Sequence, residues 1–113
     1  MHTILRYTLL GAITLPLLHS QTDAARIAGT ISDASGAVIQ NAIVIVKNEK
    51  TGQSRKVSTN EQGLYFATQL QPASYNLKAE APGMSLAEYS GIGLGVGQER
   101  LLNVIMQPST IIT

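Results

Sequence analysis

The sequence predicts an all-β fold, a sandwich of two sheets. Short runs rich in β-branched and aromatic residues alternate with turns containing Gly, Asn or Pro, at a spacing of roughly ten residues. After residue 20, no window has the period and length of a helix. The chain has 113 residues, of which 44% are hydrophobic, so the composition is that of one small folded domain.

Seven stretches carry the strand pattern, with a short extension at Val38–Ile39. In chain order they are Ala25–Ser32, Ala42–Lys47, Gln53–Thr59, Leu64–Ala67, Tyr75–Ala81, Met84–Ile92 and Glu99–Met106. In the first stretch alternate residues face one side: Ile27, Gly29 and Ile31. Asp33–Gly36 then has the composition of a turn, because Asp can bond its own backbone and Gly accepts a positive φ. The second stretch (AIVIVK) is the most apolar after the N-terminal segment, so we expect a central strand buried on both faces.

The middle of the chain holds an exposed strand and a strongly alternating one. Gln53–Thr59 is polar, and its charges discourage edge-to-edge pairing, so we expect an exposed or edge strand. Leu64–Ala67 follows as a short strand after the turn Asn60–Gly63. A loop at Leu70–Ser74 leads to Tyr75–Ala81, where alternate residues face one way: Tyr75, Leu77, Ala79 and Ala81.

The last part of the chain is rich in glycine. A turn at Pro82–Gly83 precedes Met84–Ile92, and glycines at alternate positions then leave the apolar residues on one face of an extended chain: Ile92, Leu94 and Val96. The final strand, Glu99–Met106, has these candidates for its inward face: Leu101, Leu102, Val104 and Met106. Pro108 ends it, and we interpret residues 108–113 as a tail or a truncated linker.

Residues 1–20 have the pattern of a secretory signal peptide. A start containing Arg6 is followed by the apolar run Thr8–Leu18 and by small residues, which predicts a helical leader. The run is shorter than the roughly 20 residues of a transmembrane helix, so we expect no membrane span in the mature chain. Cleavage is expected after Ser20, with Ala24 as the second site; an uncleaved anchor or a buried strand is the alternative.

Charge and composition exclude several kinds of site. Eight Lys and Arg residues against seven Asp and Glu residues give a net charge of +1, whereas a nucleic-acid-binding domain needs a basic face. The chain has no Cys, which excludes disulfides, thiolate zinc sites and iron–sulfur clusters. His2 and His19 both lie in the predicted leader, so the mature chain lacks the commonest general base and metal ligand. We therefore expect that the protein is not an enzyme and that it binds no metal and no cofactor.

A series of short motifs lies between Arg26 and Gln107, each weak alone. In order they are IAGTISD (27–33), SGAVI (35–39), AIV (42–44), TG (51–52), TNEQGLYF (59–66), LQPASYNL (70–77) and APG (81–83). Their order and spacing resemble the carboxypeptidase regulatory-like domain family. The resemblance implies a seven-stranded Greek-key β-sandwich over residues 25–107, prealbumin-like or immunoglobulin-like, and related to carbohydrate-binding-like modules.

The motifs are most similar to those at the N-terminus of TonB-dependent, Oar-like outer-membrane receptors of Gram-negative bacteria. There a signal peptide precedes the sandwich, and a plug and a barrel follow it. The resemblance implies a non-catalytic, exported binding or assembly module of the periplasm or outer membrane. Because the sequence given stops at Thr113, we expect an excised domain, a truncated product or an orphan module. The edges expected to receive an outer-membrane or periplasmic protein are Gln53–Thr59 and Glu99–Met106. The alternative is a free-standing carbohydrate-binding or cell-surface adhesion module, extracellular, with a glycan as its partner.

The sequence departs from the family pattern at turn positions. Gln40–Asn41 stands where Pro-Gly is usual, and Asn tolerates the left-handed conformation. Ala73 stands where Gly is usual, so we expect that loop to differ if its φ is positive. Met84 replaces an aromatic residue.

The matched residues have structural rather than chemical roles, and no catalytic residue is carried over. Four glycines are expected to form turns: Gly36, Gly52, Gly63 and Gly83. We expect Tyr65 and Tyr75 to pack between the sheets or to bond nearby backbone groups. Tyr89 lies outside the motifs and is the candidate for contact with a ligand such as a sugar.

Other polar patterns have simpler explanations. The oxygen-bearing turn residues lack the dense spacing of a Ca²⁺ loop: Asp33, Asn48, Asn60 and Glu61. The alternate glycines of 91–97 do not match a phosphate-binding motif. Nothing in the sequence brings Glu80 and Glu88 together as a glycosidase pair. The basic residues of the middle strands are interpreted as a solvated face: Lys47, Lys50, Arg55 and Lys56.

Overall fold

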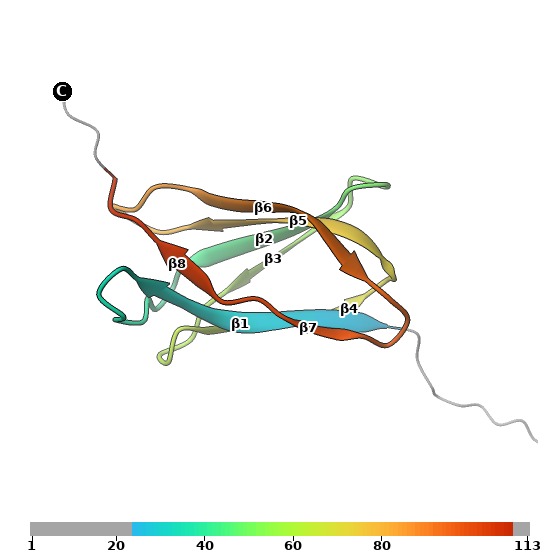
Figure 1. Cartoon of the computed structure of the whole chain (residues 1–113), viewed down its shortest axis with the longest axis horizontal. Coiled ribbons are helices and arrows are strands. Elements are labelled where there is room, and N and C mark those ends of the chain that lie inside the picture. Colours follow the sequence, from blue (N-terminus) through green and yellow to red (C-terminus); the bar gives the residue numbers. More distant parts are fainter. Residues whose placement is uncertain (1–23, 110–113) are drawn as a thin grey trace, which may run out of the picture.

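The computed structural model describes residues 24–109, which form two four-stranded sheets packed face to face (Figure 1). Within these residues the elements are β1 (Ala25–Asp33), β2 (Ile43–Asn48), β3 (Ser54–Ser58), β4 (Leu64–Leu70), β5 (Ala73–Glu80), β6 (Ala87–Leu94), β7 (Glu99–Leu101) and β8 (Val104–Met106). The predicted all-β sandwich is confirmed. The predicted leader and the end of the predicted tail lie outside the described residues. No helix within residues 24–109 has the length and hydropathy to span a membrane.

The two sheets differ in how their strands run. In the first sheet β1 lies between β4, to which it is antiparallel, and the successive strands β7 and β8, to which it is parallel. The second sheet has the order β3-β2-β5-β6 and is antiparallel throughout. The chain crosses between the sheets after β1, β3, β4 and β6, so neither sheet can form from one continuous segment.

The structure has eight strands rather than the expected seven, because the last predicted strand is broken at Leu102 and Asn103. At the break, the N–H of Leu102 donates to the carbonyl of Ala28 (2.8 Å). The next donor of β1, the N–H of Thr30, bonds the side-chain Oδ1 of Asn103 (2.9 Å) instead of a backbone carbonyl, which interrupts the ladder. Leu101 lies on the outer face with 64% of its surface exposed, so the prediction that it faces inward is wrong.

Gly29 allows the broken strand to lie close against β1. A Cβ at this position would lie 2.0 Å from the carbonyl oxygen of Leu102, so any side chain would force the two segments apart. The phenol of Tyr65 donates a hydrogen bond to that same oxygen (2.6 Å). The carbonyl at the break is therefore satisfied by a side chain, as a buried backbone group must be.

The core fills the space between the sheets with the residues that each strand turns inward. Its most deeply buried large side chains are Ile27, Ile31, Val44, Val46, Tyr65, Leu77, Val104 and Met106. The alternation predicted for the first strand and for Tyr75–Ala81 is confirmed, because the inward residues of β1 and β5 are buried. Ala28 is also buried, on the outer face of β1, where it lies between Phe66 and Leu101.

β2 is a central strand, as predicted, but only one of its faces is buried. On the other face Ile43 and Ile45 are half-buried. Ile45 lies in register between Lys56 of β3 and Lys78 of β5, so lysine stems flank it on the solvent side. The prediction of burial on both faces is wrong, because an antiparallel sheet of a two-layer sandwich needs only one apolar face.

The connection between β4 and β5 is tighter than predicted. β5 begins at Ala73, so the expected loop Leu70–Ser74 contains only two residues outside the strands. The positive φ falls on Gln69 (58°) and not on Ala73. Asn41 takes the other positive φ of a non-glycine residue (63°) among residues 24–109, in keeping with its tolerance of the left-handed region.

The glycine-rich segment is extended over only part of its length. β6 begins at Ala87 rather than at Met84, which forms an isolated bridge with Pro108. The strand ends at Leu94, and Val96 lies in the following turn with 71% of its surface exposed. The predicted single apolar face therefore includes Ile92 and Leu94 but not Val96.

Candidate functional site

The polar residues predicted to form turns are engaged in the turns themselves. The four glycines lie in turns with positive φ: Gly36, Gly52, Gly63 and Gly83. Asp33 Oδ1 accepts from the N–H groups of Ser35 (2.9 Å) and Ala37 (3.1 Å). The Ser35 hydroxyl, which also donates to Oδ1 (2.7 Å), is the main cause of the lowered pKa of Asp33. Asn60 Oδ1 accepts two backbone N–H bonds in the same way. Residues 24–109 hold no group of three or more acidic, His or Cys side chains that could bind a metal.

The three described tyrosines lie between the sheets. Tyr65 is fully buried; burial raises the pKa of its phenol, and the nearby Tyr89 adds to the rise. Tyr75 is buried and donates to the carbonyl of Gln71 (2.8 Å). Tyr89, the candidate for ligand contact, is half-buried and packs against the core on the inward face of β6. Its ring is thus not presented as an open platform in this structure.

Glu80 and Glu88 share the outer face of the second sheet but make separate contacts. Glu88 accepts a hydrogen bond from Asn76 Nδ2 (2.9 Å), whereas Glu80 lies opposite Ile43 in the neighbouring strand. Arg55 lies opposite the inward-facing Val46, whereas Lys56, the next residue of β3, lies opposite Ile45 on the outer face. Lys47, Lys56 and Lys78 therefore share the outer face of the second sheet, and Arg55 lies apart from them on the inner side.

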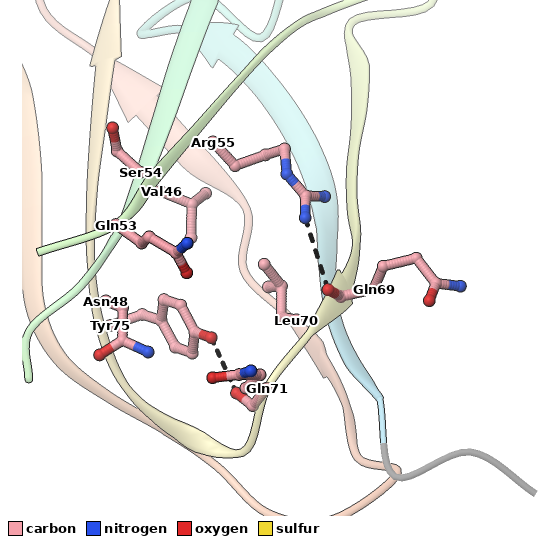
Figure 2. A pocket seen from close by; sticks show the side chains of 9 residues that line it. All are labelled: Val46, Asn48, Gln53, Ser54, Arg55, Gln69, Leu70, Gln71 and Tyr75. Atoms are coloured by element: carbon pink, nitrogen blue, oxygen red, sulfur yellow. Dashed lines mark hydrogen bonds between the residues drawn. The ribbon is translucent and has the colours of Figure 1, made fainter. Parts of the chain in front are cut away.

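A small pocket lies at one end of the sandwich, beside the turns that join β2 to β3 and β4 to β5 (Figure 2). Its volume is about 200 Å³, and it is lined by Val46, Asn48, Gln53, Ser54, Arg55, Gln69, Leu70, Gln71 and Tyr75. The buried members form an apolar base, with Asn48 the polar exception, and the more exposed members are polar. The pocket thus combines a closed apolar side with an open side rich in amides.

Asn48 is the buried polar residue of this pocket, with 4% of its surface exposed. Its Oδ1 accepts the N–H groups of Lys50 (2.8 Å) and Thr51 (3.0 Å), which closes the β2–β3 turn. Because these bonds fix the orientation of the amide, Nδ2 points away from the turn. Nδ2 makes no hydrogen bond within residues 24–109. The residue lies directly opposite Tyr75 on β5.

Arg55 supplies the single charge of the pocket lining. Its guanidinium donates to the carbonyl of Gln69 (3.4 Å; Figure 2) and to that of Thr68, which ties the edge of β3 to the edge of β4. No carboxylate lines the pocket, and the one ion pair among residues 24–109 joins Arg26 to Glu99. The cation is therefore held by backbone carbonyls and faces no acidic side chain.

Sequence reasoning did not find this pocket. The Asn48–Gly52 segment has the composition of a turn, and Arg55 falls in a polar strand, so each has an ordinary explanation when taken alone. Only the pairing of β2 with both β3 and β5, and the contact of β3 with β4, brings them together.

Comparison with known proteins identifies the fold. The profile of the family described as carboxypeptidase regulatory-like domain matches residues 26–107. A Bacteroides uniformis protein, provisionally described as carbohydrate-binding, superposes with a TM-score of 0.62 at 17% identity, over 78% of this chain and 43% of that one. The Bacillus anthracis TIE protein superposes with a TM-score of 0.63 at 17% identity, over 95% of this chain and 19% of that one. Hydroxyquinol 1,2-dioxygenase from Pseudomonas putida superposes with a TM-score of 0.60 at 10% identity, over 80% of this chain and 58% of that one. Among curated proteins no sequence matches the chain.

These likenesses show a shared β-sandwich fold. At 10% to 17% identity they extend to the fold alone. The chain spans less than two thirds of each of the three solved structures, so the activities in their names belong to longer proteins.

Proposed function

The chain belongs to the carboxypeptidase regulatory-like domain family, and on this basis we propose that it is a non-catalytic, exported module that binds a protein partner through the outer edge of β7 and β8. The observation that carries the proposal is that these two strands pair with β1 on one side only. An unpaired strand edge offers backbone donors and acceptors to a strand of another protein.

Apolar side chains accompany this edge. Leu101 and Ile105 are 64% and 58% exposed, and Phe66 of β4 is 50% exposed. Phe66 and Leu101 both lie opposite Ala28 in register, so they form one row across the outer face of the first sheet. A partner strand added beside β7 would extend a face that is already apolar, which favours protein contact over exposure to water.

The edge of β3 is a weaker candidate. Both Gln53–Thr59 and Glu99–Met106 are edge segments, as the sequence predicts. The side chain of Arg55, however, reaches from β3 to the backbone of Thr68 and Gln69 on β4. Arg100 of β7 makes one comparable contact, to the carbonyl of Gly93 (3.3 Å). The β7–β8 edge is favoured because it carries the exposed large apolar side chains Leu101 and Ile105, whereas β3 carries none.

The cellular setting that fits this proposal is the periplasmic face of an outer membrane. The motif order resembles the N-terminal extension of TonB-dependent, Oar-like receptors, and residues 1–20 have the pattern of a secretory leader. In that setting the module contacts the plug of its own receptor or another envelope protein.

Site-specific photo-crosslinking in a Gram-negative bacterium tests the proposal. A photoreactive residue is placed at Leu101, or as the control at the exposed Gln62 of the β3–β4 turn, on the other side of β1, in the full chain. We expect a mature product beginning at Gln21 or Ala25 in the envelope fraction, and a crosslink to a TonB-type receptor from position 101 alone. Ile105→Lys in the same chain should abolish it. Retention of an uncleaved chain in the cytosol, or equal crosslinking from both positions, contradicts the proposal.

A further inference from the structure

We propose that the pocket between the β2–β3 turn and the β4–β5 turn binds an acidic sugar, a pyranose ring that carries a carboxylate. No residue of β7 or β8 lines this pocket, so the site is independent of the edge contact proposed above. Three properties of the pocket indicate this ligand. Within the part of the chain that the structure describes, it holds a buried NH₂ group with no hydrogen-bond partner, a guanidinium that faces no carboxylate, and exposed side-chain amides beside an apolar base.

The buried donor is Nδ2 of Asn48. Buried polar groups in folded proteins have hydrogen-bond partners in nearly all cases, and an exception calls for an explanation. Here Oδ1 is committed to Lys50 and Thr51, and Nδ2 has no partner within residues 24–109 although the residue is only 4% exposed. A ligand oxygen seated in the pocket supplies the missing acceptor.

The cation is the guanidinium of Arg55. A guanidinium has five N–H donors, and the bonds to Thr68 and Gln69 leave others available. Its planar fork suits the two oxygens of a carboxylate, and the pocket lining holds no acid that would repel one. The charge of the pocket therefore selects an anionic group.

The remaining lining matches a sugar better than a bare anion. The side-chain amides of Gln53 and Gln71 form no hydrogen bonds within residues 24–109, and each can both donate to and accept from a hydroxyl. Val46, Leu70 and Tyr75 give an apolar base for the C–H face of a ring. A volume of about 200 Å³ lies below the ~300–1,000 Å³ of sites for larger ligands, so we expect a single ring to enter.

Calorimetric and NMR titration of the full chain with tri-galacturonate and tri-mannuronate tests this site. The comparison ligands are the methyl-esterified trimers, in which the carboxylate is neutral, together with acetate and inorganic phosphate. We expect one of the acidic trimers to bind at least about tenfold more tightly than its ester. The side-chain NH₂ resonances of Asn48 should shift on binding.

Two variants and a matched control connect the binding to the pocket. Asn48→Asp keeps the oxygen that closes the turn and replaces the Nδ2 donor with a charged oxygen, so binding should be lost. Gln71→Ala removes an exposed amide and should weaken binding several-fold in a folded chain. Gln62→Ala changes an exposed amide outside the pocket and should leave binding unchanged.

Several results would overturn the assignment. Absence of binding by both acidic trimers, equal binding of acid and ester, or binding of phosphate or acetate as tight as that of the trimer each rules out an acidic-sugar site. So does unchanged binding in Gln71→Ala, or in a folded Asn48→Asp chain. Ile105→Lys, which addresses the edge contact, should leave sugar binding intact, so failure of one proposal is distinguishable from failure of the other.

Discussion

Gly29→Ala should destabilise the domain far more than an ordinary glycine substitution. The added Cβ would lie 2.0 Å from the carbonyl oxygen of Leu102, whereas real Cβ contacts stay beyond 3.0 Å. The obstacle is backbone, so the segment between β7 and β8 must move away by about 1 Å or more. Gly93→Ala is the matched control, because its Cβ would meet nothing within 4 Å on an exposed position of β6.

The magnitude follows from the bonds that such a movement breaks. Three hydrogen bonds hold the segment: Leu102 N–H to Ala28 (2.8 Å), Asn103 Oδ1 from Thr30 (2.9 Å), and the Tyr65 phenol to Leu102 (2.6 Å). A lengthening of about 1 Å takes each of them beyond hydrogen-bonding distance. At about 1 kcal/mol each, with some recovery by water, the loss in the free energy of unfolding is about 2–3 kcal/mol.

Urea unfolding of the full chain, followed by far-ultraviolet circular dichroism, measures this loss directly. In a thermal scan of the same protein, Gly29→Ala should lower the Tm by about 8–24 °C. Gly93→Ala should be neutral or stabilising by about 0.5 kcal/mol, because it restricts the unfolded chain. A Gly29→Ala protein within about 0.5 kcal/mol of the wild type would refute the close approach of the two segments.

Three further substitutions test separate features. Tyr65→Phe leaves the buried carbonyl of Leu102 without its partner and should lower the free energy of unfolding by about 1–3 kcal/mol in a urea titration; an unchanged midpoint would contradict the bond. Asp33→Asn tests the turn after β1: hydrogen bonds lower the pKa of Asp33 from 3.8, so the charged form stabilises the fold above that value and the benefit disappears as pH falls through the lowered pKa. The difference in Tm between wild type and Asp33→Asn should therefore shrink as the pH is lowered from about 5 to about 3, and a constant difference would argue against it. Gln69→Gly removes a side chain from a positive φ of 58° and should raise the free energy of unfolding by about 0.5–1 kcal/mol; a loss of stability would show that the Gln69 side chain matters more than its backbone.

The sandwich could be predicted because its signals are local. In β5, alternate burial of Tyr75, Leu77 and Ala79 follows from the period of a strand, whatever lies around it. The turn at Asp33 is likewise set by its own hydrogen bonds to nearby N–H groups. Such features need no knowledge of the partner strand.

The features that were wrong or missed depend on contacts between distant segments. The break at Leu102 arises from its approach to Gly29 across the first sheet, and nothing in the last strand itself encodes it. Tyr89 was a candidate for ligand contact because it lies outside the turn motifs, but its half-buried position follows from the pairing of β6 with β5. The pocket needs Asn48, Arg55 and Gln71 from three connected segments, and each has a plain local explanation.

The pairing of β1 with β7 and β8 has a consequence for how the protein is made. The first strand to leave the ribosome finds one of its two neighbours only in the last strands, and the bonds of Arg26 and Thr30 reach partners 73 residues further on. Contacts between such distant residues form late and slow the search for the native state. Translation must therefore pass Met106 before the first sheet can close, and until then the nascent polypeptide remains accessible to chaperones and translocation machinery.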